Sequence, residues 1–198
     1  MPDQFLNIEE RTTLMQLARQ ALEDSVLGRP PESLDMDSLS APLREMGASF
    51  VTLTIRGQLR GCIGTLDAYQ SLAEDVCTHA VDAALHDYRF PPVQPQELPF
   101  IDIEISRLTK PTPLAYKDGN ELLHLLRPGV DGVILRDGHH KSTFLPQVWE
   151  KLPDPVDFLE HLCEKMGAPA NLWRRKHLDV SIYHVEEFHE NRLNTSRH

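Results

Sequence analysis

The sequence predicts an α+β fold with a mainly antiparallel sheet, built from two hairpin-containing halves with flanking helices. Two patterns support this prediction. Strand-like segments occur in pairs that are joined by short turns, at residues 50–56 with 58–65 and at residues 131–136 with 141–145. Helical periodicity appears before and after each pair. Because hairpins outnumber parallel strand–helix–strand units, antiparallel pairing is favoured over a doubly wound sheet.

The helices have recognisable start signals. Asn7 with Glu10, and Ser71 with Glu74, have the spacing of a capping box, which predicts helices over residues 8–26 and 71–88. Leucines at 122–126 suggest a short helix, Pro146 can open another, and Asp154-Pro155 opens a helix that ends at Gly167. Single strands are expected at residues 100–108 and 178–185, where apolar and polar residues alternate.

The residue pattern over residues 30–46 predicts a segment that is neither a helix nor a strand. Turn-forming residues alternate there with isolated apolar side chains such as Leu34 and Leu39. We expect an extended arm that wraps the body of the protein rather than a free linker.

Composition excludes several classes of protein. The chain has 198 residues and a formal charge of -10, with three cysteines, Cys62, Cys77 and Cys163, that lack CxxC spacing. An acidic chain whose basic residues cluster only in the short run Arg174-Arg175-Lys176 is a poor binder of nucleic acid. The cysteines predict neither disulfides nor a zinc site. No apolar run has membrane length, so we expect no membrane contact and a cytoplasmic location.

Cys62 is the first candidate functional residue. It lies in a predicted strand between Gly61 and Gly64, and glycine inside a strand often marks a place where something approaches the backbone closely. The thiol would then be sterically open. The alternative is a small buried cysteine in a kinked strand.

The next helix along the chain offers candidate partners. His79 lies on one face of it and is either a half-buried histidine bonded to a backbone carbonyl or a base for Cys62. Asp87 and Arg89, at its end, form either a structural ion pair or part of the site. The adjacent His139 and His140 lie on a turn without acidic or cysteine companions, so no metal site is predicted.

Several motifs resemble one known family. Leu59-Arg60-Gly61-Cys62-Ile63-Gly64 resembles the LRGCIG signature of the AMME syndrome candidate gene 1 protein family. Further matches are Gly47–Leu53, Asp87–Pro92, Ile105–Leu108, Pro128–Gly132, Thr143–Trp149, Phe158–Leu159 and Lys165–Gly167. The resemblance implies one domain over residues 1–198, with two closely associated lobes around a cleft.

His79 and His86 lie outside the family pattern. The resemblance favours Arg60, Cys62, Asp87, Arg89 and Thr143 as the functional set, and it implies an association with Memo-like and radical S-adenosylmethionine proteins.

Two hypotheses of function remain open. In the first, the chain is an enzyme or enzyme component in which Cys62 attacks an electrophile or carries a group. Arg60 or Arg89 would favour the thiolate and bind an anionic substrate. Asp87 would orient Arg89 or accept a proton. In the second, it is a non-catalytic regulatory module in which Gly61 and Gly64 let a small-molecule or peptide ligand approach. No cofactor fingerprint such as GxGxxG is present, so a cofactor stays unassigned.

Overall fold

The computed structural model describes residues 5–190 and divides into two compact units. Unit 1 contains the chain up to Leu108 and again from Glu186, and unit 2 contains Thr109–Val185. Each unit has its own sheet and its own hydrophobic core. The expected α+β class is therefore confirmed, and each half contains a predicted hairpin. The arrangement of two lobes around a cleft stays a prediction.

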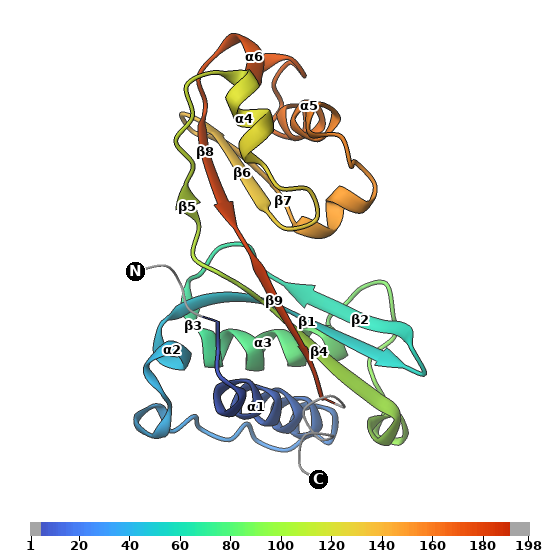
Figure 1. Cartoon of the computed structure of the whole chain (residues 1–198). Helices are drawn as coiled ribbons and strands as arrows, with labels where there is room; N and C mark the ends of the chain where they lie inside the picture. Colours follow the sequence, from blue (N-terminus) through green and yellow to red (C-terminus); the bar gives the residue numbers. More distant parts are fainter. Residues whose placement is uncertain (1–4, 191–198) are drawn as a thin grey trace. The chain divides into compact units, whose positions relative to one another are not determined.

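Unit 1 is a sheet with two long helices on one face (Figure 1). Its strands follow the order β2-β1-β4-β9, and the short β3 pairs with β1. The elements are α1 (Ile8–Val26), η1 (Met36–Ser38), α2 (Ala41–Arg44), β1 (Met46–Ile55), β2 (Gln58–Gly64), β3 (Gln70–Ser71), α3 (Leu72–Leu85), η2 (Pro95–Phe100), β4 (Ile101–Leu108) and β9 (Val185–His189). Alternate residues of β1 and β4, such as Val51 and Ile105, are buried against apolar residues of α1 and α3.

The β1–β2 hairpin places Cys62. Its two loop residues, Arg56 and Gly57, both have positive φ (53° and 76°), as a type I′ turn requires. The antiparallel register pairs Thr52 with Cys62 and Leu53 with Gly61, then shifts so that Thr54 pairs with Leu59. Arg60 is thus the extra residue of a β-bulge, and a bulge turns its side chain away from the regular direction.

Unit 2 is a four-stranded antiparallel sheet in the order β5-β8-β6-β7. Its elements are β5 (Thr112–Pro113), α4 (Gly119–Leu125), β6 (Gly132–Asp137), β7 (His140–Phe144), η3 (Pro146–Glu150), α5 (Pro155–Lys165), α6 (Leu172–Arg175) and β8 (Asp179–Tyr183). The Trp149 and Phe158 rings stack in its core, with centroids 3.7 Å apart. Gly138 has a φ of 59° in the β6–β7 loop, where glycine carries no steric cost.

Most local predictions are confirmed. Both capping boxes form, at Asn7 with Glu10 and at Ser71 with Glu74. The segment after Pro146 is a 3₁₀-helix, and the helix begun at Ser71 ends at Leu85 rather than near Tyr88.

The strand expected over residues 178–185 forms over residues 179–183 as β8, but the sequence analysis missed the strand that follows it. The chain passes from β8 in one sheet to β9 in the other. Between them, Thr109 and His184 exchange hydrogen bonds: the His184 N–H donates to the Thr109 hydroxyl, and the Thr109 N–H donates to the His184 carbonyl. An alternating pattern does not show which sheet a residue joins, so the change of partner was invisible in the sequence.

Within residues 5–190, no helix combines the length and the apolar character that crossing a membrane demands.

The packing at Gly61 generates a prediction. A Cβ added there would lie 2.1 Å from the Ala83 carbonyl oxygen of α3, so Gly61→Ala forces β2 away from the helix. We expect the free energy of unfolding to fall by about 1–3 kcal/mol, measured by urea denaturation. The control is Gln58→Ala, at an exposed position of the same strand. Equal urea midpoints for the two variants would show that the helix contact does not restrict the strand.

Candidate functional site

Cys62 lies on β2, at the edge of the sheet, and its side chain points to the face opposite α1 and α3. Neighbouring residues of a strand point to opposite faces, and Gly61 faces the Ala83 carbonyl of α3. The cross-strand partner of Cys62 is Thr52, whose hydroxyl donates a hydrogen bond to Sγ at 3.3 Å. The residue is partly exposed. The thiol is therefore not sealed in the hydrophobic core.

Asp87 and Arg89 hold the backbone of Cys62. The Cys62 N–H donates to Asp87 Oδ2 at 2.9 Å, and Arg89 Nη2 donates to the Cys62 carbonyl at 3.0 Å. Arg89 also donates to both Asp87 oxygens, at 2.9 and 2.7 Å. Because β2 is an edge strand, these backbone groups would otherwise lack a partner strand. We call this arrangement the edge clamp: the two side chains take the place of the next strand.

The edge clamp also determines the charge state of its members. Hydrogen bonds from the Arg89 side chain, aided by the backbone N–H groups of Cys62 and Arg89, hold the pKa of Asp87 well below its usual range, although burial opposes them. Asp87 in turn raises the pKa of Arg89. A carboxylate with so low a pKa is a weak base. The geometry therefore favours a positioning role for Asp87 over the proton transfer that we considered from the sequence.

Arg60 is paired with another carboxylate. Its Nε and Nη2 donate to the two oxygens of Glu97 at 2.7 and 3.0 Å, and this bidentate pair lowers the pKa of Glu97. The third nitrogen, Nη1, is buried, and it has no hydrogen-bond partner among the described residues. Both arginines near Cys62 are thus already neutralised by carboxylates of the chain. Neither supplies the free positive charge that would favour a thiolate or an anionic substrate.

The chain itself fills the space beside both glycines. A Cβ on Gly61 would meet Ala83, and a Cβ on Gly64 would lie 2.4 Å from the Phe50 ring and from the Ser49 carbonyl. Packing therefore requires a residue without a side chain at both positions, which lie on opposite faces of the strand. Helix backbone fills the space beside Gly61, and an aromatic ring fills the space beside Gly64, so neither glycine itself leaves an open space. Their role in ligand binding stays a prediction.

Thr143 lies in unit 2, where its hydroxyl is 3.1 Å from the Tyr183 hydroxyl and its carbonyl accepts from Lys165 Nζ at 2.9 Å. Burial raises the pKa of Tyr183 to about 12, so that hydroxyl stays protonated. The Tyr183 ring also packs on Gly132, where a Cβ would lie 2.4 Å from it. These contacts explain Thr143 as part of a buried hydrogen-bond group. Its predicted binding role stays a prediction.

His79 of α3 and His86, which follows the helix, each lie beside a carboxylate of α3. His79 is almost fully buried, with Nδ1 3.2 Å from Asp75 Oδ2, and Asp75 also accepts from the Ser49 hydroxyl at 2.6 Å. Because α3 covers the other face of the sheet, His79 does not face the Cys62 thiol, and its interpretation as a base for Cys62 is wrong. His86 pairs with Asp82 at 2.7 Å on the exposed surface.

Three residues that the sequence analysis missed share the polar face with Cys62. The register places Cys62 opposite Thr52, and Thr52 opposite Glu104 on β4. On the next strand, His189 Nδ1 lies 3.2 Å from Glu104 Oε2. We call Cys62, Thr52, Glu104 and His189 the polar row. The alternation of β4 placed Glu104 on a polar face, but only the strand order aligns that face with Cys62.

The other two thiols are poor nucleophiles. Burial, aided by the charge of Glu74, raises the pKa of Cys77 to about 11, and burial raises the pKa of Cys163.

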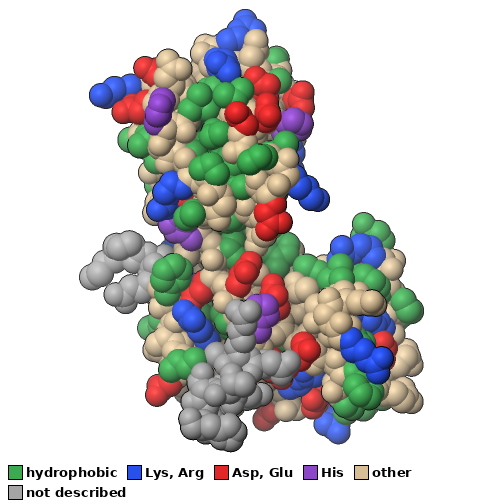
Figure 2. All heavy atoms as spheres, turned by 45° about the vertical axis from the view of Figure 1, so that its right-hand side comes forward, with side chains coloured by type: hydrophobic (Ala, Val, Ile, Leu, Met, Phe, Trp, Pro, Cys, Tyr) green, Lys and Arg blue, Asp and Glu red, His purple; other side chains and the backbone are tan. Residues whose placement is uncertain are grey.

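Across residues 5–190, no group of three or more His, Cys, Asp or Glu side chains is placed to hold a metal ion. On the face shown in Figure 2, positive and negative side chains are interspersed, without a continuous basic patch.

Fold and site together define a class of α+β protein: two antiparallel sheets, with a partly exposed cysteine on an edge strand that an Asp–Arg pair clamps. The chain belongs to the AMMECR1 family, which it matches over residues 15–188, as the resemblance implied. It is 37% identical to a protein of Methanothermobacter thermautotrophicus, covering 93% of this chain and 96% of the relative. It is 35% identical to one of Thermofilum pendens, covering 93% and 92%.

A solved structure agrees with the fold. The crystal structure of an uncharacterised protein from Pyrococcus horikoshii is 31% identical, covers 92% of both chains and gives a TM-score of 0.72. The names of these relatives state no activity, so function has to be argued from the site.

The edge clamp predicts a pH dependence of stability. Since folding lowers the pKa of Asp87, its contribution to stability is complete above its unfolded pKa of about 3.9 and is lost as pH falls toward the folded value. Asp87→Asn should lower the free energy of unfolding by about 2 kcal/mol at neutral pH, and by less below about pH 4.

Urea denaturation across this pH range measures the effect. Asp37→Asn, on the exposed arm, is the matched control for removal of one carboxylate. An Asp87→Asn curve that runs parallel to the wild-type curve down to acid pH would show that the ionised carboxylate does not hold the strand.

Proposed function

We propose that the chain is an enzyme, or a component of an enzyme system, that uses the Cys62 thiol as a nucleophile or group carrier on the polar face of unit 1. One observation carries the proposal: three different side chains hold the three polar groups of Cys62. Asp87 accepts from its N–H, Arg89 donates to its carbonyl, and Thr52 donates to its sulfur. Such support fixes a reacting atom within the narrow limits that chemistry requires.

The chemistry depends on the sulfur and its one donor. As a thiolate, Sγ attacks an electrophilic carbon of the substrate; an S–C bond forms, and the leaving group departs with its electron pair. The thiol proton passes to solvent. The Thr52 hydroxyl can donate to the ionised sulfur, because hydrogen bonds to an ionised group are stronger than neutral ones. Asp87 and Arg89 act as positioning residues through the backbone, and Arg60 stabilises the bulge beside them through Glu97.

The positions of the polar row residues indicate what shape of substrate could contact them. Adjacent strands lie about 4.8 Å apart, so Glu104 on β4 lies about 10 Å from Cys62 across the sheet. A substrate that reacts at the sulfur would need an extended polar part to contact Glu104 and His189. The resemblance adds that Memo-like and radical S-adenosylmethionine proteins would act with this chain, and these partners are part of the proposal.

A second function is favoured by a specific observation. Both arginines are already paired with carboxylates, and the space at Gly61 and Gly64 is filled. In a non-catalytic regulatory module, Cys62 would be only the residue that fits beside Thr52. The two functions differ in whether the sulfur atom itself is needed.

Alkylation by iodoacetamide tests the thiol. We expect Cys62 to be labelled first in the folded protein, because burial raises the pKa of Cys77 and of Cys163, and Cys163 is also buried. Thr52→Val should slow labelling of Cys62 several-fold, since the thiolate loses its donor. Thr54→Val, on the same face of β1, is the matched control. Peptide mass mapping gives the rates, and equal labelling of the three cysteines in the folded chain would contradict the proposal.

Mass spectrometry of the full chain, purified with its endogenous ligands, separates the two functions. An enzyme that carries a group on sulfur should show a mass adduct on the peptide that contains Cys62, and Cys62→Ser should lose it. If Cys62→Ser retains the same co-purified ligand and the wild-type chain shows no adduct, the binding module is supported instead.

A further inference from the structure

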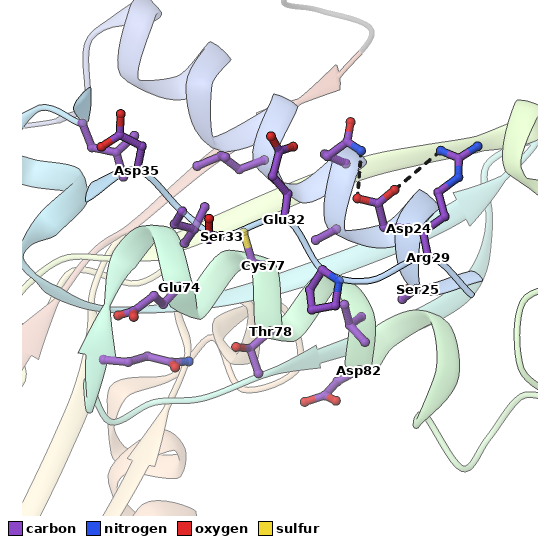
Figure 3. Close-up of a pocket in the computed structure, with 18 of the residues that line it drawn as sticks. Asp24, Ser25, Arg29, Glu32, Ser33, Asp35, Glu74, Cys77, Thr78 and Asp82 are labelled. Atoms are coloured by element: carbon purple, nitrogen blue, oxygen red, sulfur yellow. Dashed lines mark hydrogen bonds and ion pairs between the residues drawn. The ribbon is translucent and has the colours of Figure 1, made fainter. Parts of the chain in front are cut away.

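Unit 1 contains a groove far from the polar row, on the helical side of the sheet. It lies between α1 and α3 and runs beneath residues 29–39, which we call the strap (Figure 3). The strap groove has a volume of about 840 Å³, within the range of small-molecule sites in proteins. Because Cys62 does not line it, a ligand in this groove would be independent of the proposed function of the thiol.

The strap lies over this space and is largely exposed to solvent. The sequence predicted an extended arm over residues 30–46. The structure agrees over the strap, which has no regular structure apart from the short η1, but residues 41–44 form the helix α2. Most of its residues are exposed, while Leu34 and Leu39 pack against the core. Among the described residues, no hydrogen bond joins residues 30–35 to α3. Residues 30–35 can therefore shift locally without breaking hydrogen bonds to α3.

The inner wall of the strap groove is apolar. α1 contributes Leu17 and Ala21, α3 contributes Val81 and Cys77, and the strap contributes Leu34 and Leu39. With a pKa of about 11, the Cys77 thiol is protonated at neutral pH and acts as a small apolar group. Apolar surface of this extent favours a ligand with an aliphatic or aromatic body.

The rim of the strap groove is acidic. Its carboxylates are Asp24, Glu32, Asp35, Glu74 and Asp82, and Arg29 is its single Lys or Arg. Arg29 lies 3.5 Å from Asp24 and is thereby paired (Figure 3), while Asp82 is paired with His86. Among the described residues, Glu32, Asp35 and Glu74 form no ion pair. The unbalanced charge on the rim is negative, and it complements a cation.

We propose that the strap groove binds a small organic ammonium ligand, with its apolar body against Leu17, Val81 and Leu34 and its charged nitrogen at the rim near Glu32. The apolar wall and the acidic rim are both needed for this assignment. The wall alone would accept any apolar molecule, and the rim alone would attract any cation. Together they select a molecule that carries both features.

The test uses the isotope-labelled full chain and three probes of similar size: phenylbutylamine, the corresponding alcohol and the corresponding carboxylic acid. Amide shifts are followed by NMR at millimolar concentrations of each probe. We expect the amine to shift amides of the strap and of residues 74–82, the alcohol to bind more weakly, and the acid not to bind. Equal binding of all three, or shifts confined to other regions, would overturn the proposal.

Two variants locate the site. Glu32→Gln removes a charge from an exposed residue without a described hydrogen bond, and it should weaken amine binding about two- to fivefold. Glu9→Gln, exposed in the first turn of α1, removes the same charge outside the groove and should leave binding unchanged. Ala21→Phe should block the groove. If Ala21→Phe fails to fold, the comparison of Glu32→Gln with Glu9→Gln tests the site. An equal loss of amine binding in both variants would contradict a binding site at the rim of the strap groove.

Discussion

The edge clamp is the interaction on which the candidate site depends. An edge strand leaves every second N–H and C=O without a partner, and at Cys62 these groups are taken by Asp87 and Arg89. The clamp has two consequences. It blocks the addition of another strand at this point, and it couples the position of the thiol to the turn after α3. A substitution in that turn would therefore act on Cys62 through the backbone, without contact with the sulfur.

The LRGCIG segment, residues 59–64, packs closely against neighbouring parts of unit 1. Gly61 lets β2 approach the backbone of α3, Gly64 gives room to the Phe50 ring, and the bulge at Arg60 directs that side chain to Glu97. Gly61, Gly64 and Arg60 thus each have a packing or hydrogen-bonding role that can be named. These roles do not account for the cysteine itself, and our proposal therefore assigns the function to the sulfur rather than to its neighbours.

Unit 1 carries two surfaces of different character. The polar row lies on the face away from the helices, whereas the strap groove lies between the helices and has an apolar wall with an acidic rim. Cys62 and Cys77 illustrate the contrast: both residues are partly exposed, but Thr52 donates to the sulfur of Cys62, whereas burial and the charge of Glu74 raise the pKa of Cys77. Similar residues acquire different roles when burial and neighbouring charges differ.

The sequence by itself determined the α+β class, the two hairpins, both capping boxes and the family, because these depend on local periodicity, local caps and ordered motifs. It also brought Cys62, Asp87 and Arg89 into one candidate set. Only the tertiary structure decided what they do together, since the role of Asp87 depends on which backbone groups an edge strand leaves free. The residues aligned with Cys62, namely Thr52, Glu104 and His189, are set by strand order and register, which join positions far apart in the chain. For the same reason, the division of residues 178–189 between two sheets could not be read from alternation alone.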